Sequence, residues 1–328
     1  MFADALEAIL RDHAAPADVR AIEAGGDGLP LWQRIAEAGF LQLLTPEERG
    51  GAAACPQDLF PVFELLGRYA VPLPVGQSIA AQAFLPDGAA PAGLITLAPA
   101  LRIAPDGRLS CPAVPFGTIA DFVLAEHDDS LWLLPCAPAL RLSIAQGRSQ
   151  CATLRWDKQP AFARFARPDA CFAAFAAALH AALLAGAMER VFQMTLAYGN
   201  DRVQFGRSIG KFQAIQHQLA VMAEQLASAR MAAQSAWATA QAPTLLQGAI
   251  AKARSSEAVP VISAIAHSIH GAIGITEEYD LQLFTRRLHE WRMAHGSEDY
   301  WHRVVGREAL RGSMPAATFV RAAAQGEG

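Results

Sequence analysis

The segment RVQFGRSIGKFQ, residues 202–213, separates two long helical patterns and contains two glycines. Glycine permits the tight turns of a loop, so we predict that this segment is a loop that opens the second helix. The N-terminus of a helix attracts anions, and a guanidinium can donate two hydrogen bonds to one phosphate. Arg202 and Gln213, which bracket the loop, therefore suit a pyrophosphate. The alternative is a surface arginine that pairs with Asp201 or Glu189.

The apolar residues on either side of this loop follow helical spacing. From residue 213 to residue 239 they step by four and three, which places one stripe on one helix face: Ile215, Leu219, Met222, Leu226 and Ala229. Leu179, Leu183 and Met194 mark a second helix of similar length. Two long antiparallel helices with such stripes need partners, so residues 159–328 are predicted to form a four-helix bundle. Pro260, inside a third helical pattern, predicts a kink or a helix start.

Two further regions precede this bundle. Residues 91–158 alternate short apolar runs with turns, and Asp106-Gly107 and Asp128-Asp129 lie between such runs as hairpin turns do. Residues 1–90 have helical spacing, for example in LWQRIAEAGF and DLFPVFELLG. The predicted fold class is mainly α with a small β domain: an N-terminal helical domain at 1–90, a middle β domain at 91–158 and a C-terminal four-helix bundle at 159–328.

The composition argues against several classes of partner. The chain has 328 residues and a net charge of −4, which argues against nucleic acid. The most apolar stretch, residues 171–188, is interrupted by His180 and followed at once by Glu189 and Arg190, so we predict a buried helix and no membrane span. The five cysteines form no C-x-x-C pair and no metal-binding spacing, as expected of reduced thiols in a cytoplasmic protein with no metal site.

Three segments resemble the acyl-CoA dehydrogenase family. LWQRIAEAGFLQLLTPEERGG, residues 31–51, is similar to the family's N-terminal helix pair and its P-E-x-x-G-G loop. Segment 202–213 matches the R-x-x-F-G-x-x-I-x-x-F-Q pattern nearly in full and is the most specific of the three. HGAIG at 270–274, followed by EYDL at 278–281, resembles the family's Q-x-H-G-G-x-G-x-T-x-E segment. The order and spacing of these segments agree along almost the whole chain.

This resemblance implies a FAD-dependent oxidoreductase that desaturates the Cα–Cβ bond of a CoA thioester, in lipid or steroid catabolism. An acyl-CoA would be its substrate, and electron-transfer flavoprotein or another acceptor would take the electrons. The resemblance also implies a homo- or hetero-oligomer, a dimer or a tetramer, in which segment 202–213 meets FAD bound mainly by the neighbouring subunit. The implied FAD-binding residues are Arg202, Phe205, Gln213, His270, Gly271, Gly274 and Ser297.

The catalytic base is where this sequence departs most from the family. Removal of a weakly acidic α-proton needs a base placed against it, and the family uses a glutamate. Counted from Gly306-Arg307-Glu308, which resembles the family's A-R-E, the matching position is His295. Histidine has a reference pKa of about 6.5 and is a competent base, but it could also hold a ligand or bond to backbone. Glu298 is a further candidate, whereas the family's alternative position, Ala176, has no carboxylate.

Other departures point the same way. Ser268 and Ala272 replace a glutamine and a glycine of the family pattern, and LITLAPA at 94–100 lacks the family's Glu-Pro pair. The basic cluster at 286–292 is either an anion patch for CoA phosphates or a solvated helix face with an i,i+4 pair between Arg286 and Glu290. The sequence therefore allows a complete dehydrogenase, a non-catalytic partner that completes a FAD site in an α2β2 complex, or a helical scaffold without flavin.

Overall fold

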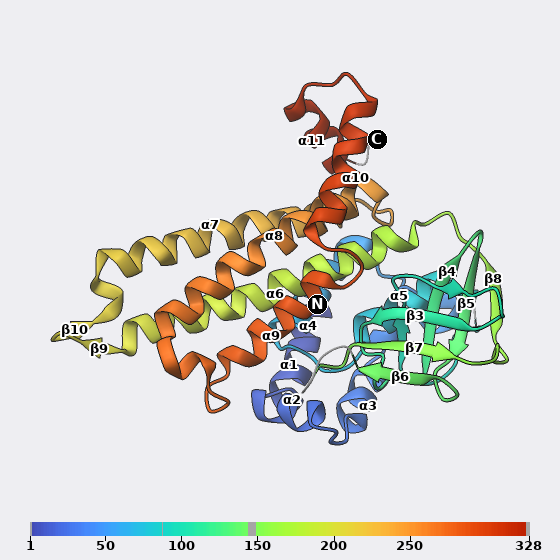
Figure 1. Cartoon of the computed structure of the whole chain (residues 1–328), viewed down its shortest axis with the longest axis horizontal. Coiled ribbons are helices and arrows are strands. Elements are labelled where there is room, and N and C mark those ends of the chain that lie inside the picture. Colours follow the sequence, from blue (N-terminus) through green and yellow to red (C-terminus); the bar gives the residue numbers. More distant parts are fainter. Residues whose placement is uncertain (1, 87, 144–148, 326–328) are drawn as a thin grey trace.

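The computed structural model describes residues 2–86, 88–143 and 149–325, and it consists of a long helical bundle with a β domain at one end (Figure 1). The N-terminal helices lie against the bundle: α1 (Phe2–His13), α2 (Pro16–Glu23), α3 (Leu29–Glu37), α4 (Pro56–Arg68) and α5 (Val75–Phe84), with 3-10 turns at Phe40–Gln42 and Glu47–Arg49. Prolines at the first helical positions of α2 and α4 suit helix starts, because the missing N–H has no partner there.

The β domain contains two four-stranded sheets, ordered β1-β4-β5-β8 and β2-β3-β7-β6. Its strands are β1 (Ile95–Leu97), β2 (Arg102–Ile103), β3 (Leu109–Val114), β4 (Phe122–His127), β5 (Ser130–Pro135), β6 (Leu140–Ser143), β7 (Ala152–Trp156) and β8 (Ala163–Ala166). The two predicted hairpin turns join β2 to β3 and β4 to β5, with φ of +82° at Gly107 and +50° at Asp128. Strand β8 pairs with β5 beyond the predicted boundary at residue 158, because an exposed strand carries little apolar alternation.

The C-terminal bundle is built around one alanine-rich helix. Its elements are α6 (Phe172–Asp201), the short strands β9 (Val203–Gln204) and β10 (Arg207–Ser208), 3-10 turns at Ile209–Lys211 and Gly271–Ile275, α7 (Gln213–Ser235), α8 (Leu245–His270), α9 (Leu281–Met293), α10 (Glu298–Arg311) and α11 (Ala316–Gln325). Helix α6 packs against α4, α7, α8 and α9. Helix α8 continues through Pro260, so no helix starts at that proline.

Two glycines let α4 and α6 touch backbone to backbone. A Cβ on Gly186 would lie 1.8 Å from the carbonyl oxygen of Glu64, and one on Gly67 would lie 2.0 Å from that of Leu183. Such separations exclude any larger residue. Helices α6 and α8 are long and apolar enough to cross a membrane by length and composition, but 89% of the most apolar window of α6 is buried inside the protein. The predicted buried helix at 171–188 is thus the centre of the bundle.

One buried arginine joins the three regions of the chain. Arg287 of α9 is fully buried, and its guanidinium lies 2.7 Å from Oε1 of Glu23 on α2. It donates to Oε1 of Gln150 at 2.6 Å and to Oε1 of Glu290 at 3.2 Å. Gln150 in turn donates to the carbonyl of Pro72 at 2.8 Å. A charge so far from water is stable only while all of these partners remain.

Replacement of Arg287 by methionine should therefore destabilise the protein strongly. After this change the buried carboxylate of Glu23 keeps its ion pair with Arg286 but loses the one with Arg287. Breaking a buried ion pair costs about 3–5 kcal/mol. We expect a loss of this size in the free energy of unfolding, measured by urea denaturation. The double variant Arg287→Met/Glu23→Leu should recover part of it.

The control for this prediction is Arg34→Met, which removes an arginine that is 63% exposed and pairs loosely with Glu37 at 3.8 Å. Arg34→Met should change the free energy of unfolding by no more than about 0.5 kcal/mol. Equal effects of Arg34→Met and Arg287→Met would contradict the role of Arg287 as the link between the three regions.

Candidate active site

The predicted site residues lie in two groups at opposite ends of the bundle. Helix α6 runs from Phe172, beside the β domain, to Asp201, where the β9–β10 hairpin begins (Figure 1). Thirty residues of α-helix span about 45 Å. Arg202, Phe205 and Gln213 belong to the hairpin end, whereas His295 lies at the β-domain end.

The hairpin exposes an apolar tip. Phe205 and Gly206 both have positive φ, at +52° and +78°, and the Phe205 side chain is 90% exposed. Arg207 stacks on the ring of Phe212, with its guanidinium carbon 4.1 Å from the ring centre. A phenylalanine so exposed on a strained turn is unfavourable in water unless another surface covers it.

Arg202 is not engaged as a surface ion pair. Among the described residues no carboxylate lies within ion-pairing distance of its guanidinium, and Glu189 instead accepts a hydrogen bond from Gln193 at 3.1 Å. The predicted alternative, a pair with Asp201 or Glu189, is therefore wrong. Gln213 occupies the first position of α7, as predicted, and its side chain is exposed. Both side chains are free to meet a ligand or another chain.

His270 closes the same end of the bundle from α8. Its ring stacks on Tyr198 at 4.4 Å and lies 5.1 Å from Tyr279, and its Nδ1 donates to the carbonyl of Ala266 at 2.8 Å. Burial lowers the pKa of His270, so the ring is neutral near pH 7. Among the described residues its Nε2 has no hydrogen-bond partner.

The two predicted glycines behave differently. Gly271 ends α8 with φ of +64°, and open space surrounds the position of a Cβ, so a ligand can approach its backbone. Gly274 is a packing residue, because a Cβ there would lie 2.9 Å from the Cβ of His270 and 3.0 Å from Cδ2 of Leu281. The structure thus gives only Gly271 the open surroundings that a bound dinucleotide needs.

At the other end of α6, a cavity of about 380 Å³ lies between the β domain and the bundle. Its lining residues come from the β domain, from the start of α6, from the link between α9 and α10, and from the first turn of α10: Ala98, Pro99, Ala100, Leu101, Glu126, His127, Asp128, Phe172, Ala173, His295, Gly296, Tyr300 and Trp301. His295 therefore lies at a cavity, as a site residue should. Ser297, next to it, begins α10 without a side-chain cap, and its hydroxyl has no partner among the described residues.

His295 is buried and neutral. Burial, and then the neighbouring His180 and Lys252, hold the pKa of His295 well below its usual value of 6.5, although a hydrogen bond to the backbone of Leu97 opposes this. A base with so low a pKa has little affinity for a proton. The burial of His295 and its bond to the backbone of Leu97 suit the structural and positioning roles that the sequence left open.

The other base candidates are also unsuited. Glu298 is paired with Arg292, which donates to both of its carboxylate oxygens. This pairing lowers the pKa of Glu298. Ala176 is fully buried on α6 and carries no acid. Of the residues that line the cavity, the acids are Glu126 and Asp128 on the β-domain rim, away from both family positions.

Two buried residues at this end were missed by sequence reasoning. His180 of α6 lies against His295 with 4.9 Å between ring centres, and burial lowers its pKa to about 3. Lys252 of α8 is fully buried, and burial lowers its pKa to about 7. For His180 the available signal was a single polar residue within a long apolar helical run, since such a residue must find partners or a function. Lys252 carried no such signal, because Arg254, Ser255 and Ser256 follow it closely.

The basic cluster at 286–292 matches neither predicted arrangement. Arg286 lies 2.6 Å from Oε2 of Glu23, and Arg287 is fully buried, so the helix face is not a solvated one. Glu290 pairs with Arg287, three residues earlier, at 3.2 Å. Glu23 of α2 pairs with Arg286 and Arg287, and Glu298 of α10 pairs with Arg292, so each of the three arginines already has a carboxylate partner.

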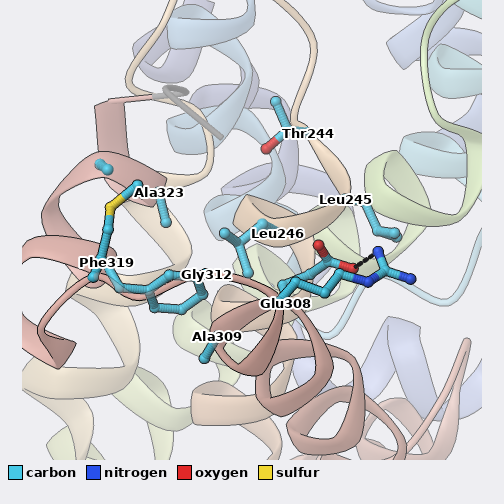
Figure 2. Close-up of a pocket in the computed structure, with 11 residues that line it drawn as sticks. Thr244, Leu245, Leu246, Glu308, Ala309, Gly312, Phe319 and Ala323 are labelled. Carbon is cyan, nitrogen blue, oxygen red and sulfur yellow. Dashed lines mark hydrogen bonds and ion pairs between the residues drawn. The ribbon is translucent and has the colours of Figure 1, made fainter.

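A second hollow, of about 430 Å³, lies between the start of α8 and helices α10 and α11 (Figure 2). Leu246 and Phe319 form apolar walls, and Arg311 donates to Glu308 at 2.6 Å at its edge. It contains none of the predicted site residues. In the described part of the chain, no three histidine, cysteine, aspartate or glutamate side chains gather as metal ligands would.

Known proteins resemble the chain along most of its length. Family models described as "Acyl-CoA dehydrogenase, N-terminal domain" and "Acyl-CoA dehydrogenase, C-terminal domain" match residues 1–88 and 172–310. Acyl-CoA dehydrogenase IpdE2 of Mycobacterium tuberculosis is 34% identical over 299 residues, which are 88% of this chain and 90% of that protein.

Two solved structures share the fold. The ChsE4–ChsE5 complex from Mycobacterium tuberculosis has a TM-score of 0.84 at 22% identity, over 95% of this chain and 97% of the matched chain. A variant of the Tcur3481–Tcur3483 steroid ACAD has a TM-score of 0.75 at 22% identity, over 94% and 97%. The three-region fold predicted from the sequence is thereby confirmed.

The two buried histidines should make the protein sensitive to mild acid. Their folded pKa values lie below the unfolded value of 6.5, so the unfolded chain binds more protons as the pH falls. As the pH falls from 7 to 5, each of these two histidines should lower the free energy of unfolding by about 2 kcal/mol. His180→Leu should remove about half of this combined loss, measured by urea denaturation at both pH values. His217→Leu, which replaces an exposed histidine of α7, should leave the loss unchanged.

Proposed function

The chain belongs to the acyl-CoA dehydrogenase family, and from this premise we propose that it is one subunit of a FAD-dependent oxidoreductase that desaturates the Cα–Cβ bond of a CoA thioester. The supporting observation is the length of α6, about 45 Å, between the Arg202 hairpin and the His295 cavity. The hairpin cannot serve the cavity of its own chain over that distance. It must serve the site of a neighbouring subunit.

We further propose that another chain supplies the carboxylate base. His295 is neutral and buried, Glu298 is held by Arg292, and the alternative position is Ala176. Two of the similar structures are named for pairs of different chains, ChsE4–ChsE5 and Tcur3481–Tcur3483, which supports a hetero-oligomer for this chain too. The chain is then the partner subunit that completes a FAD site.

The residues at the hairpin end fit FAD. The free guanidinium of Arg202, at the approach to the N-terminus of α7, suits a pyrophosphate. The exposed ring of Phe205 needs an apolar cover, and the backbone at Gly271 is open. When bound, FAD would supply the hydride acceptor, and these residues would hold its phosphates and exclude water.

The acyl group is proposed to be bulky and to carry rings. Ala173 is the α6 residue that follows Phe172 in the cavity wall, and its small side chain leaves more room than a larger one would. The Tcur3481–Tcur3483 protein is described as a steroid ACAD, which supports a steroid-derived acyl-CoA here. Electron-transfer flavoprotein is the proposed acceptor.

The cofactor assignment is tested on the assembled protein. The chain purified alone should be pale, and co-expression with a partner that carries the glutamate should give a yellow complex with near-stoichiometric FAD. Arg202→Ala should lower FAD retention after gel filtration by at least tenfold, because the pyrophosphate loses its cation. Arg321→Ala, an exposed arginine of α11, is the matched control and should retain FAD. Full retention by Arg202→Ala would contradict the assignment.

The location of the base is tested separately. Loss of a general base lowers kcat by about 10²–10⁴-fold. His295→Gln in the assembled complex should lower kcat for an acyl-CoA by less than tenfold, since His295 is neutral and bonded to the backbone of Leu97. Single-turnover reduction of FAD measures this step. A loss of more than a hundredfold would make His295 the base and this chain a complete dehydrogenase.

A further inference from the structure

The wall of the cavity is a strained turn. His295 has φ of +52° and Gly296 has φ of +101°, so two consecutive residues lie in the left-handed half of backbone space. A histidine adopts this conformation only where its surroundings determine it. Gly296 cannot be larger, because a Cβ there would lie 2.7 Å from Cδ1 of Tyr300 and 2.8 Å from Nε1 of Trp301.

The ammonium group of Lys252 binds both sides of this turn. It donates to the carbonyl of Arg292 at 2.7 Å, to the carbonyl of Gly296 at 3.0 Å and to the hydroxyl of Ser256 at 2.9 Å. The carbonyl of Arg292 is near the end of α9, where helical carbonyls lack partners. All three N–H groups of one buried ammonium are thus used, and two of them fix backbone on either side of His295.

A separate contact holds the middle of the turn. Nε1 of the buried Trp301 donates to the carbonyl of His295 at 2.9 Å. Ser256 also donates to the carbonyl of Arg292, at 3.4 Å. Lys252, from a different helix, α8, bonds the carbonyls of both Arg292 and Gly296 and so spans the turn.

We propose that Lys252 is a positioning residue that holds the His295–Gly296 turn in its left-handed form and so shapes the wall of the substrate cavity. Its relevance to catalysis rests on the function proposed above. Lys252 does not line the cavity, so it acts through the turn and touches no substrate.

The hold depends on the charge of the lysine. An ammonium has three N–H donors, whereas a neutral amine has two and a lone pair that repels a carbonyl oxygen. The charged or titratable groups around Lys252 are His180 on α6, His295 in the turn, Arg292 on α9 and Glu298 on α10. Burial lowers the pKa of Lys252 to about 7, with Glu298 opposing the shift and Arg292 adding to it. The turn should therefore loosen as the pH rises above neutrality.

This loosening is distinct from global unfolding. The unfolded chain keeps Lys252 protonated up to about its ordinary pKa of 10.5, so between pH 7 and pH 10.5 it binds more protons than the folded chain does. The contribution of Lys252 to overall stability consequently rises with pH, while the order of the turn falls. A loss of protection confined to the turn therefore identifies the positioning role.

Hydrogen–deuterium exchange of the full-length chain tests this without flavin or partner. Lys252→Met should raise the exchange rate of amides in residues 296–301 at least tenfold at pH 6.5, with no change in α9 before the turn. The matched control is Arg254→Met on the same helix, which removes bonds to Ser228 and Gln225 on α7 and leaves the turn intact. Equal protection of the turn in Lys252→Met and wild type would overturn the proposal.

A second arm needs no variant and so remains informative if Lys252→Met fails to fold. In the wild-type chain, exchange of the turn amides should rise at least fivefold from pH 6 to pH 8.5 beyond the intrinsic pH dependence of exchange, while core amides of α6 show no such rise. A turn that follows only the intrinsic dependence would overturn the proposal. Because neither arm measures FAD or activity, failure of the proposed function would be seen separately, as a complex that never binds FAD.

Discussion

The structure depends first on the buried guanidinium of Arg287. It is fully buried, yet its partners come from all three regions: Glu23 from the N-terminal helices, Gln150 from the β domain and Glu290 from α9. A buried charge tolerates few alternative arrangements, because a movement that removes one of its partners leaves the charge uncompensated and destabilises the folded state. This constraint fixes how the β domain meets the bundle.

Burial away from water also sets the pKa values of three side chains near the cavity. His180, His295 and Lys252 face one another in an apolar surrounding, and each has a lowered pKa because burial disfavours its charged form. Most acyl-CoA dehydrogenases keep a glutamate where this chain has His295. The ring of His295 is neutral and bonded to the backbone of Leu97. We propose that the chain keeps the architecture of the site without a proton-accepting group of its own, as a subunit whose chemistry is shared would.

The features predicted well from the sequence are local ones. The bundle helices, the two hairpin turns and the loop before α7 arise from spacings of two to four residues, and such periodicities are visible in any short window. Features that depend on distant partners were misread. The arginine cluster at 286–292 looked like an exposed face, but Arg286 pairs with Glu23, 263 residues away. Strand β8 was missed because its partner β5, and not its own pattern, makes it a strand.

The sequence alone determined that the chain has helical, β and helical regions in that order, that a loop containing Arg202 precedes a long helix, and that no glutamate stands at position 295. These conclusions depend on residue identity and near neighbours. Only the tertiary structure decided that Arg202 and His295 lie at opposite ends of α6, that His295 is neutral, and that Lys252 holds the turn beside it. Distance, burial and protonation are set by segments far apart in the chain, because a side chain loses water only when those segments meet around it.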